Sequence, residues 1–167
     1  MGIKSFIILF VAVFAIGLAV FLYFGRSLNA HKKATIEING KTFAVDVAKT
    51  FVQRAKGLSG REKLEDKEGM FFIFGAPGKY GFWMKDMKIP IDIIWIKENK
   101  IAGFEERVDP PHKSMGGVNP QIGASDFSLK TYYPPEPVQY VLEVKAGAVQ
   151  AEGFKIGDEV RYNENRQ

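Results

Sequence analysis

The hydrophobic and polar positions of this chain follow one pattern at the N-terminus and a different one in the remainder. Phe6 to Phe24 is an apolar run without a charged residue. As a helix with a rise of ~1.5 Å per residue, this run would be roughly 28 Å long, close to the ~30 Å hydrocarbon thickness of a bilayer. The pattern therefore predicts one N-terminal transmembrane helix.

After position 31 the apolar segments become short. Thr35 to Ile38 and Phe43 to Val47 alternate apolar and polar residues around Asn39-Gly40, which is typical of a β-hairpin. The continuous runs Met70 to Phe74 and Ile91 to Ile96 predict strands that are buried on both faces. Further strands are expected at Ile101 to Val108, Val138 to Val144 and Glu159 to Tyr162, and short helices from the Thr50 cap to Lys56 and around Ala148 to Glu152.

These elements predict a mainly β (α+β) fold, either a small, partly open antiparallel barrel or a folded sheet, with two short helices. We expect residues 1–31 to form a membrane anchor with a basic flank. Residues 32–167 then form a single globular domain, because ~135 residues suffice for one core and are too few for two ordinary domains.

The anchor has one alternative, a cleavable signal peptide. Lys4 supplies the positive start of such a peptide, but the apolar run is long for a secretory core and lacks a well-placed small-residue cleavage site. We therefore expect the segment to be retained. Lys32 and Lys33 would lie beside the membrane, where anionic lipid headgroups attract them.

Charge and composition exclude several function classes. Only two of the 23 basic residues, Lys4 and Arg26, precede the predicted domain, which carries all 19 acidic residues and is therefore nearly neutral. Nucleic-acid binding is not expected of such a domain.

The chain has no cysteine, so disulfides give no information about its compartment. The few positive charges flanking the apolar run favour, by themselves, a cytoplasmic domain.

Six short blocks of the predicted domain carry a resemblance to a known family. They are Gly57-Leu58-Ser59-Gly60-Arg61, Gly69 to Phe74, Phe82-Trp83-Met84-Lys85, Ile89 to Ile94, Tyr140 to Val144 and Gly157 to Val160. In their order and spacing they resemble the DUF192 family, from about Val47 to Val160. The resemblance implies a small prokaryotic domain, often exported or membrane-anchored, with no established reaction. It favours the extracytoplasmic side, against the charge count.

Asp92 is the main candidate for a functional residue, because it interrupts an apolar strand, in which alternation places it on the same face as Ile94 and Ile96. Burying an isolated carboxylate costs many kcal/mol, so Asp92 requires a partner. Arg61 and Lys85 are the candidate partners, since the family blocks that contain them suggest that they converge, and Trp83 would add an aromatic wall. We expect these four residues to bind a small polar or cell-envelope ligand.

Each of these residues also has a structural interpretation. Asp92 can form a buried structural pair or cap the turn after Pro90, Trp83 can fill the core, and Arg61 can bind carbonyls at a helix end. Tyr132 and Tyr133 lie within a long proline-rich segment, from Asp109 to Pro137. They can form a lid over the Asp92 site or pin this segment to the sheet.

No catalytic residue, cofactor or metal is assigned from the sequence. The chain has no Gly-x-Ser-x-Gly elbow, Walker motif or dinucleotide fingerprint. His112 and Met115, with Met84 and Met87, are possible soft metal donors, but their spacing is not diagnostic. Two alternatives to a binding domain stay open: a hydrolase of envelope glycan that uses Asp92 with Glu105, Glu106 or Asp109, and a scaffold that docks a protein partner.

Overall fold

The computed structural model describes residues 10–20, 31–111 and 130–164. The chain divides into two compact units, Met1–His31 and Lys32–Gln167. In the first unit residues 10–20 are helical. Within the described ranges no helix is long and apolar enough to span a membrane. The run predicted to do so, Phe6 to Phe24, extends past residues 10–20 at both ends and so lies partly outside the described residues.

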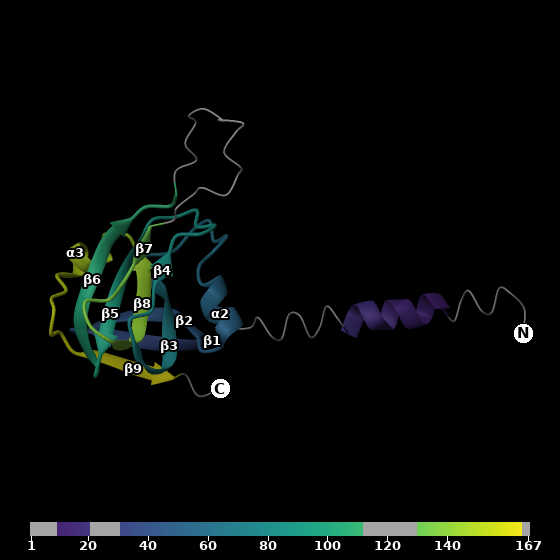
Figure 1. The fold of residues 1–167 in the computed structure, drawn as a ribbon, viewed down its shortest axis with the longest axis horizontal. Helices are drawn as coiled ribbons and strands as arrows, with labels where there is room; N and C mark the ends of the chain where they lie inside the picture. The colour runs from purple at the N-terminus through teal and green to yellow at the C-terminus, as the bar shows by residue number, and fades with distance from the viewer. Residues whose placement is uncertain (1–9, 21–30, 112–129, 165–167) are drawn as a thin grey trace, which may run out of the picture. The chain divides into compact units, whose positions relative to one another are not determined.

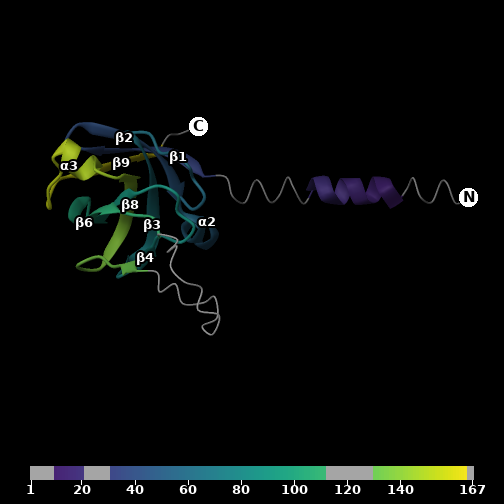
Figure 2. The same cartoon turned by 90° about the horizontal axis from the view of Figure 1, so that it is seen from above.

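The second unit is built mainly of strands, as predicted (Figure 1). Its described elements are β1 (Lys32–Ile38), β2 (Lys41–Ala48), α2 (Phe51–Lys56), β3 (Glu68–Gly78), β4 (Phe82–Trp83), β5 (Ile91–Lys97), β6 (Lys100–Val108), β7 (Thr131–Tyr132), β8 (Val138–Lys145), α3 (Ala148–Glu152) and β9 (Val160–Glu164). Seven strands form one sheet in the order β6-β5-β8-β3-β2-β1-β9 (Figures 1 and 2). β4 and β7 pair separately.

The predicted hairpin is confirmed. Ile38 of β1 pairs with Lys41 of β2, and the two residues between them, Asn39 and Gly40, have φ angles of 50° and 73°. Positive φ at both central positions is what the hairpin turn of an Asn-Gly pair requires. The helix predicted after Thr50 is also confirmed as α2, because the Thr50 side chain accepts from the Gln53 backbone in a capping box.

The sheet is not closed into a ring. Its edge strands β6 and β9 meet at one end, where Ile101 N donates to Asp158 O at 3.0 Å and Val160 N donates to Asn99 O at 2.8 Å. The expectation of an entirely antiparallel arrangement is wrong in one place, since β2 and β3 are parallel. The reason is the connection between them, in which α2 and the following loop return the chain to the end where β2 began.

The sheet buries a separate cluster of apolar side chains on each face. Along β5, Ile94 and Ile96 belong to one cluster, the first core, while Ile93 and Trp95 belong to the other, the second core. This alternation was expected from the sequence. It places Asp92 on the face of the first core. The first core also includes Phe43, Phe71, Leu142, Val144 and Val149, and the second core Met70, Phe72, Phe82, Met84 and Met87.

Gly69 is the position where β3 and β8 approach most closely. A Cβ at Gly69 would lie 2.5 Å from the carbonyl oxygen of Glu143. We expect Gly69→Ala to force the two central strands apart and to lower the free energy of unfolding by about 1–3 kcal/mol, as overpacking usually does. Urea denaturation of the full chain measures this change.

The matched control for Gly69→Ala is Gly75→Ala, in the same strand. A Cβ at Gly75 would meet no atom within 4 Å. Its urea midpoint should stay at the wild-type value or rise slightly, because alanine restricts the unfolded chain more than glycine does. Equal urea midpoints for the two variants would show that the strands β3 and β8 accommodate the added methyl group at Gly69 without a loss of stability.

Candidate functional site

Asp92 is fully buried in β5, and its three hydrogen bonds come from backbone amides. Its Oδ1 accepts from Arg107 N at 2.7 Å and from Gly147 N at 3.0 Å, and its Oδ2 accepts from Val149 N at 2.9 Å. Gly147 is the N-cap of α3 and offers no side-chain cap of its own. Asp92 therefore caps α3 from a neighbouring strand.

One of these three donors, the backbone amide of Arg107, belongs to an irregularity in β6. The pairing of β5 with β6 shifts between Ile91 and Ile93, so that two residues of β6, Glu106 and Arg107, stand opposite Asp92. Arg107 adopts a φ of 51° at this bulge. The Asp92 carboxylate thus binds both the bulge of β6 and the start of α3, on the face of the sheet that carries the first core. This is a structural role for Asp92.

The structure does not bring the predicted basic partners to Asp92. Arg61 forms an ion pair with Asp46, with 3.2 Å between Nη2 and Oδ2, and Asp46 also binds Lys33 at 2.6 Å. Lys85 is exposed, and its carbonyl oxygen accepts from the Ser59 hydroxyl at 2.9 Å. The predicted four-residue pocket is therefore not assembled around Asp92.

The two candidate lid residues are divided between different roles. Tyr132 in β7 pairs with Phe82 in β4 and packs against the second core, with Lys130 Nζ 4.4 Å from its ring centre. Tyr133 is 57% exposed, and its ring lies against Gly81. Tyr132 is thus placed as the pinning interpretation expects. Tyr133 lies beside Gly81, which lines a cavity next to the second core.

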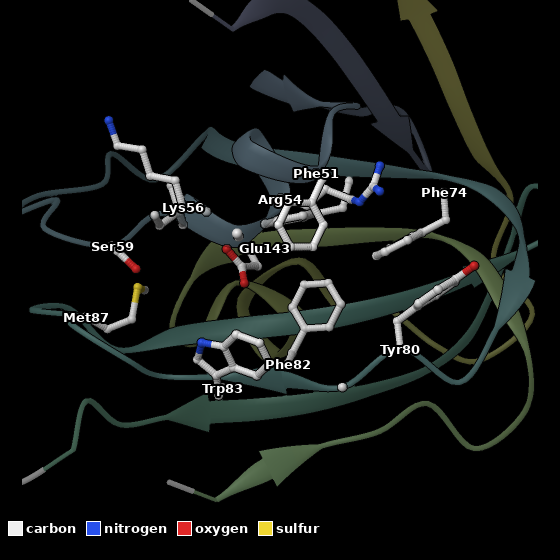
Figure 3. A pocket seen from close by; sticks show the side chains of 15 residues that line it. Phe51, Arg54, Lys56, Ser59, Phe74, Tyr80, Phe82, Trp83, Met87 and Glu143 are labelled. Atoms are coloured by element: carbon white, nitrogen blue, oxygen red, sulfur yellow. The ribbon is translucent and has the colours of Figure 1, made fainter. Parts of the chain in front are cut away.

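A cavity of about 460 Å³ lies beside the second core, lined by residues of α2, β3, β4 and β8 (Figure 3). Trp83 is the one residue of the predicted four that lines it. We call this cavity the Glu143 pocket, after the carboxyl group in its middle. Its aromatic lining residues are Phe51, Phe72, Phe74, Tyr80, Phe82 and Trp83.

Glu143 is the buried acidic group of this pocket. It sits in the central strand β8, directly opposite Met70 of β3 and Ile93 of β5, and is 7% exposed. Within the described part of the chain, its Oε2 has no hydrogen-bond partner. Burial among apolar neighbours raises the pKa of Glu143 to about 8, so the carboxyl is mainly protonated at neutral pH.

A stacked group of three side chains fixes one side of the pocket. The guanidinium of Arg54 lies 5.0 Å from the ring centre of Phe74, and Phe74 stacks on Tyr80 at 3.7 Å. Arg54 Nη1 donates to the carbonyl oxygens of Lys49 and Ile73. These bonds hold the Arg54 charge on backbone oxygens and keep this wall in place.

Sequence reasoning missed Glu143, although a signal for it was present. Val138 to Val144 was predicted as a strand, and alternation puts Glu143 on the face opposite to Leu142 and Val144. Because apolar side chains bury both faces of this strand, a carboxyl within it is as informative as Asp92. The position was interpreted only as part of a family block.

The metal donors considered from the sequence lie apart or outside the described residues. Met84 and Met87 are buried in the second core, whereas His112 and Met115 fall in the range that the structure does not describe. Among the described residues, no group of three or more His, Cys, Asp or Glu side chains could hold a metal ion.

Comparisons with known proteins give a family and two similar structures. A crystal structure of a proposed transcription regulator from Sinorhizobium meliloti 1021 is 27% identical, with a TM-score of 0.66, covering 80% of this chain and 95% of that one. A protein of unknown function from Novosphingobium aromaticivorans DSM 12444 is 26% identical, with a TM-score of 0.61, covering 77% and 83%. A comparison with curated proteins finds no match. The model of the DUF192 family, described as "Uncharacterized ACR", matches residues 34–162, so the chain belongs to the DUF192 family.

Proposed function

We propose that this protein is a membrane-anchored, extracytoplasmic binding domain, and that the Glu143 pocket holds its ligand, a small and largely apolar molecule. The observation that carries the proposal is a buried carboxyl group, that of Glu143, in the lining of an aromatic cavity, with no hydrogen-bond partner for its Oε2 among the described residues. The volume of about 460 Å³ lies within the ~300–1,000 Å³ of small-molecule sites, which combine apolar walls with a few polar groups.

The energetic cost of Glu143 supports a functional role for it. A buried polar group without a hydrogen bond costs about 1–3 kcal/mol, and an apolar residue of similar size at this position would avoid that cost. Residues that lower stability in this way are typical of sites that act on something outside the chain. A ligand that offers a hydrogen bond to Glu143 recovers the loss when it binds.

The membrane part of the proposal rests on the sequence. The apolar run from Phe6 to Phe24 has the length of a span, and a retained anchor would leave the second unit tethered. We place this unit on the extracytoplasmic side because DUF192 domains are often exported. The hydrolase alternative is not part of the proposal, because the fully buried carboxylate of Asp92 is bound by three amides and has no open face for a substrate.

The proposal is tested by filling the pocket from its rim. Ala55 lines the cavity and is exposed on α2, so Ala55→Trp should occupy the cavity without disturbing the core. Isothermal titration calorimetry of the full chain with biphenyl-4-ylmethanol should give saturable binding with a Kd below about 1 mM, given its size. Ala55→Trp should weaken this binding at least about tenfold, since it removes the volume that the ligand needs.

Val52→Trp is the matched control, because Val52 is 56% exposed on the same helix and does not line the cavity. Its Kd should stay at the wild-type value, and it corrects for partition of the probe into any exposed indole or apolar segment. Absence of saturable binding, or equal binding by the two Trp variants, would refute the Glu143 pocket as a ligand site.

A further inference from the structure

We propose that the ligand of the Glu143 pocket is an organic cation, an ammonium group on an apolar body, held between the Glu143 carboxylate and the rings of Phe51, Phe82 and Trp83. This inference rests on the proposed function and deepens it by naming the chemical class of the ligand. It concerns the part of the cavity that the Arg54, Phe74 and Tyr80 stack leaves open.

The first support is the arrangement of aromatic rings around one carboxyl group. Figure 3 shows Glu143 in the middle of the pocket, with Phe51 on one side and Phe82 and Trp83 on the other. Ring faces carry partial negative charge and attract ammonium groups, most strongly where water is excluded. A buried carboxylate between such rings attracts a cation.

The second support is that the chain does not use its own nearby cations to neutralise Glu143. The Arg54 guanidinium is bound to the carbonyl oxygens of Lys49 and Ile73. Lys56 also lines the cavity, but its ammonium group points away from Glu143 (Figure 3). No cation among the described residues therefore pairs with Glu143, and we assign this role to the ligand.

The third support is a precedent within the same cavity. Arg54 already lies over the face of Phe74, with 5.0 Å between the guanidinium carbon and the ring centre. Because Tyr80 stacks on Phe74, that ring is fully engaged. The rings of Phe51, Phe82 and Trp83 provide the same kind of surface beside Glu143, and half of Trp83 is exposed at the entrance.

Binding of a cation must expel the proton of Glu143 to solvent, so that affinity rises with pH. Met70 of β3 and Ile93 of β5, which flank Glu143, do not titrate. The other titratable groups lining the described cavity are Arg54 and Lys56 of α2 and Tyr80, whose hydroxyl donates to Ala76 O at 2.7 Å. Glu143 carries the one carboxyl group among the described residues that line the cavity, so we assign the pH dependence to it.

Three probes with one biphenyl body test this inference on the full chain by calorimetry. They are biphenyl-4-ylmethyl-trimethylammonium, which does not titrate, the neutral biphenyl-4-ylmethanol, and anionic biphenyl-4-ylacetate. With a Glu143 pKa of about 8, the Kd of the cation should fall about fivefold from pH 7 to 8 and about tenfold from pH 7 to 9. At pH 9 it should bind at least about tenfold more tightly than the alcohol.

Glu143→Gln keeps the shape of the side chain but cannot ionise. In this variant the preference for the cation over the alcohol, and the pH dependence of cation binding, should both disappear. Trp83→Leu, at an exposed position, serves if Glu143→Gln is not folded, and should reduce the preference for the cation by removing one ring.

The outcomes separate this inference from the proposed function. Binding of the alcohol as tightly as the cation at pH 9, or tightest binding of the carboxylate, overturns the cation and leaves the pocket as a ligand site. Failure of all three probes to bind overturns both. A cation preference that survives in Glu143→Gln overturns the assignment of Glu143 as its partner.

Discussion

Asp92→Ala should lower the free energy of unfolding by about 3–5 kcal/mol, one of the two largest effects expected in this chain. The variant leaves the amides of Arg107, Gly147 and Val149 without their acceptor, in a site that excludes water. It also removes the cap of α3 and the tie that holds the bulge of β6. Urea denaturation at pH 7 measures the loss.

The control for Asp92→Ala is Asp66→Ala. Asp66 forms an ion pair with Lys145 at 2.6 Å, but its side chain is 82% exposed. Exposed ion pairs contribute little, so this variant should unfold close to the wild-type midpoint. A similar loss for the two variants would mean that burial and the amide bonds of Asp92 do not determine its contribution.

Asp92→Asn separates the structural role from the ligand-binding role that the sequence suggested. The amide keeps one oxygen acceptor and turns its NH2 group toward donors, so we expect a clear loss of stability. Below its melting temperature the variant should bind biphenyl-4-ylmethanol with the wild-type Kd. Unchanged stability combined with lost binding would restore Asp92 as a ligand residue.

Asp92 shows which properties of a buried residue a sequence pattern can predict. The pattern identified a buried carboxylate on the face of Ile94 and Ile96, and both inferences are correct. Its partners could not be predicted, because they are backbone amides of a bulge and of a helix start. The residue types in the sequence do not indicate which backbone amides will lie next to Asp92. Arg61 and Lys85 were predicted as partners because they are positively charged. For the same reason they lie near the surface, where their charges stay solvated.

The hairpin and α2 could be predicted because their signals are local. Asn39-Gly40 and the Thr50 cap determine backbone conformation within a few residues. The parallel pairing of β2 with β3 depends on how the chain between them returns, which is a property of packing. The same holds for the Glu143 pocket, which is assembled from segments between Phe51 and Glu143.

The two buried carboxyl groups of the sheet illustrate opposite solutions to one problem. Asp92 and Glu143 lie on adjacent central strands and face opposite cores. Asp92 meets three backbone donors, so its burial is compensated within the fold. The Oε2 of Glu143 meets no donor among the described residues, so its burial is a cost that the folded chain carries without a ligand. The distinction between structural and functional burial therefore follows from the partners, not from the residue type.

The burial of Glu143 leads to the second large effect. The stability of the unliganded chain should fall by about 3–5 kcal/mol between pH ~5 and ~8, at about 1.4 kcal/mol per pH unit where the slope is steepest. Burial raises the pKa of Glu143 from 4.5 to about 8, so between these values the folded state binds one proton more than the unfolded state. Stability is then fully present below pH 4.5 and is lost as the pH rises toward 8.

Urea midpoints of the wild type and Glu143→Gln, measured from pH 5 to 8.5, test this dependence. The glutamine variant should lack this fall, because it has no carboxyl at position 143, and the carboxylates with lowered pKa values, such as Glu152 and Glu164, titrate below this range. The difference between the two curves removes any contribution of the histidines. Glu143→Leu should exceed the wild type in stability at pH 8, since it removes a carboxyl that must ionise in an apolar site. Parallel curves for wild type and Glu143→Gln would instead mean that Glu143 has a compensating partner, and the case for a ligand at this carboxyl would lose its physical basis.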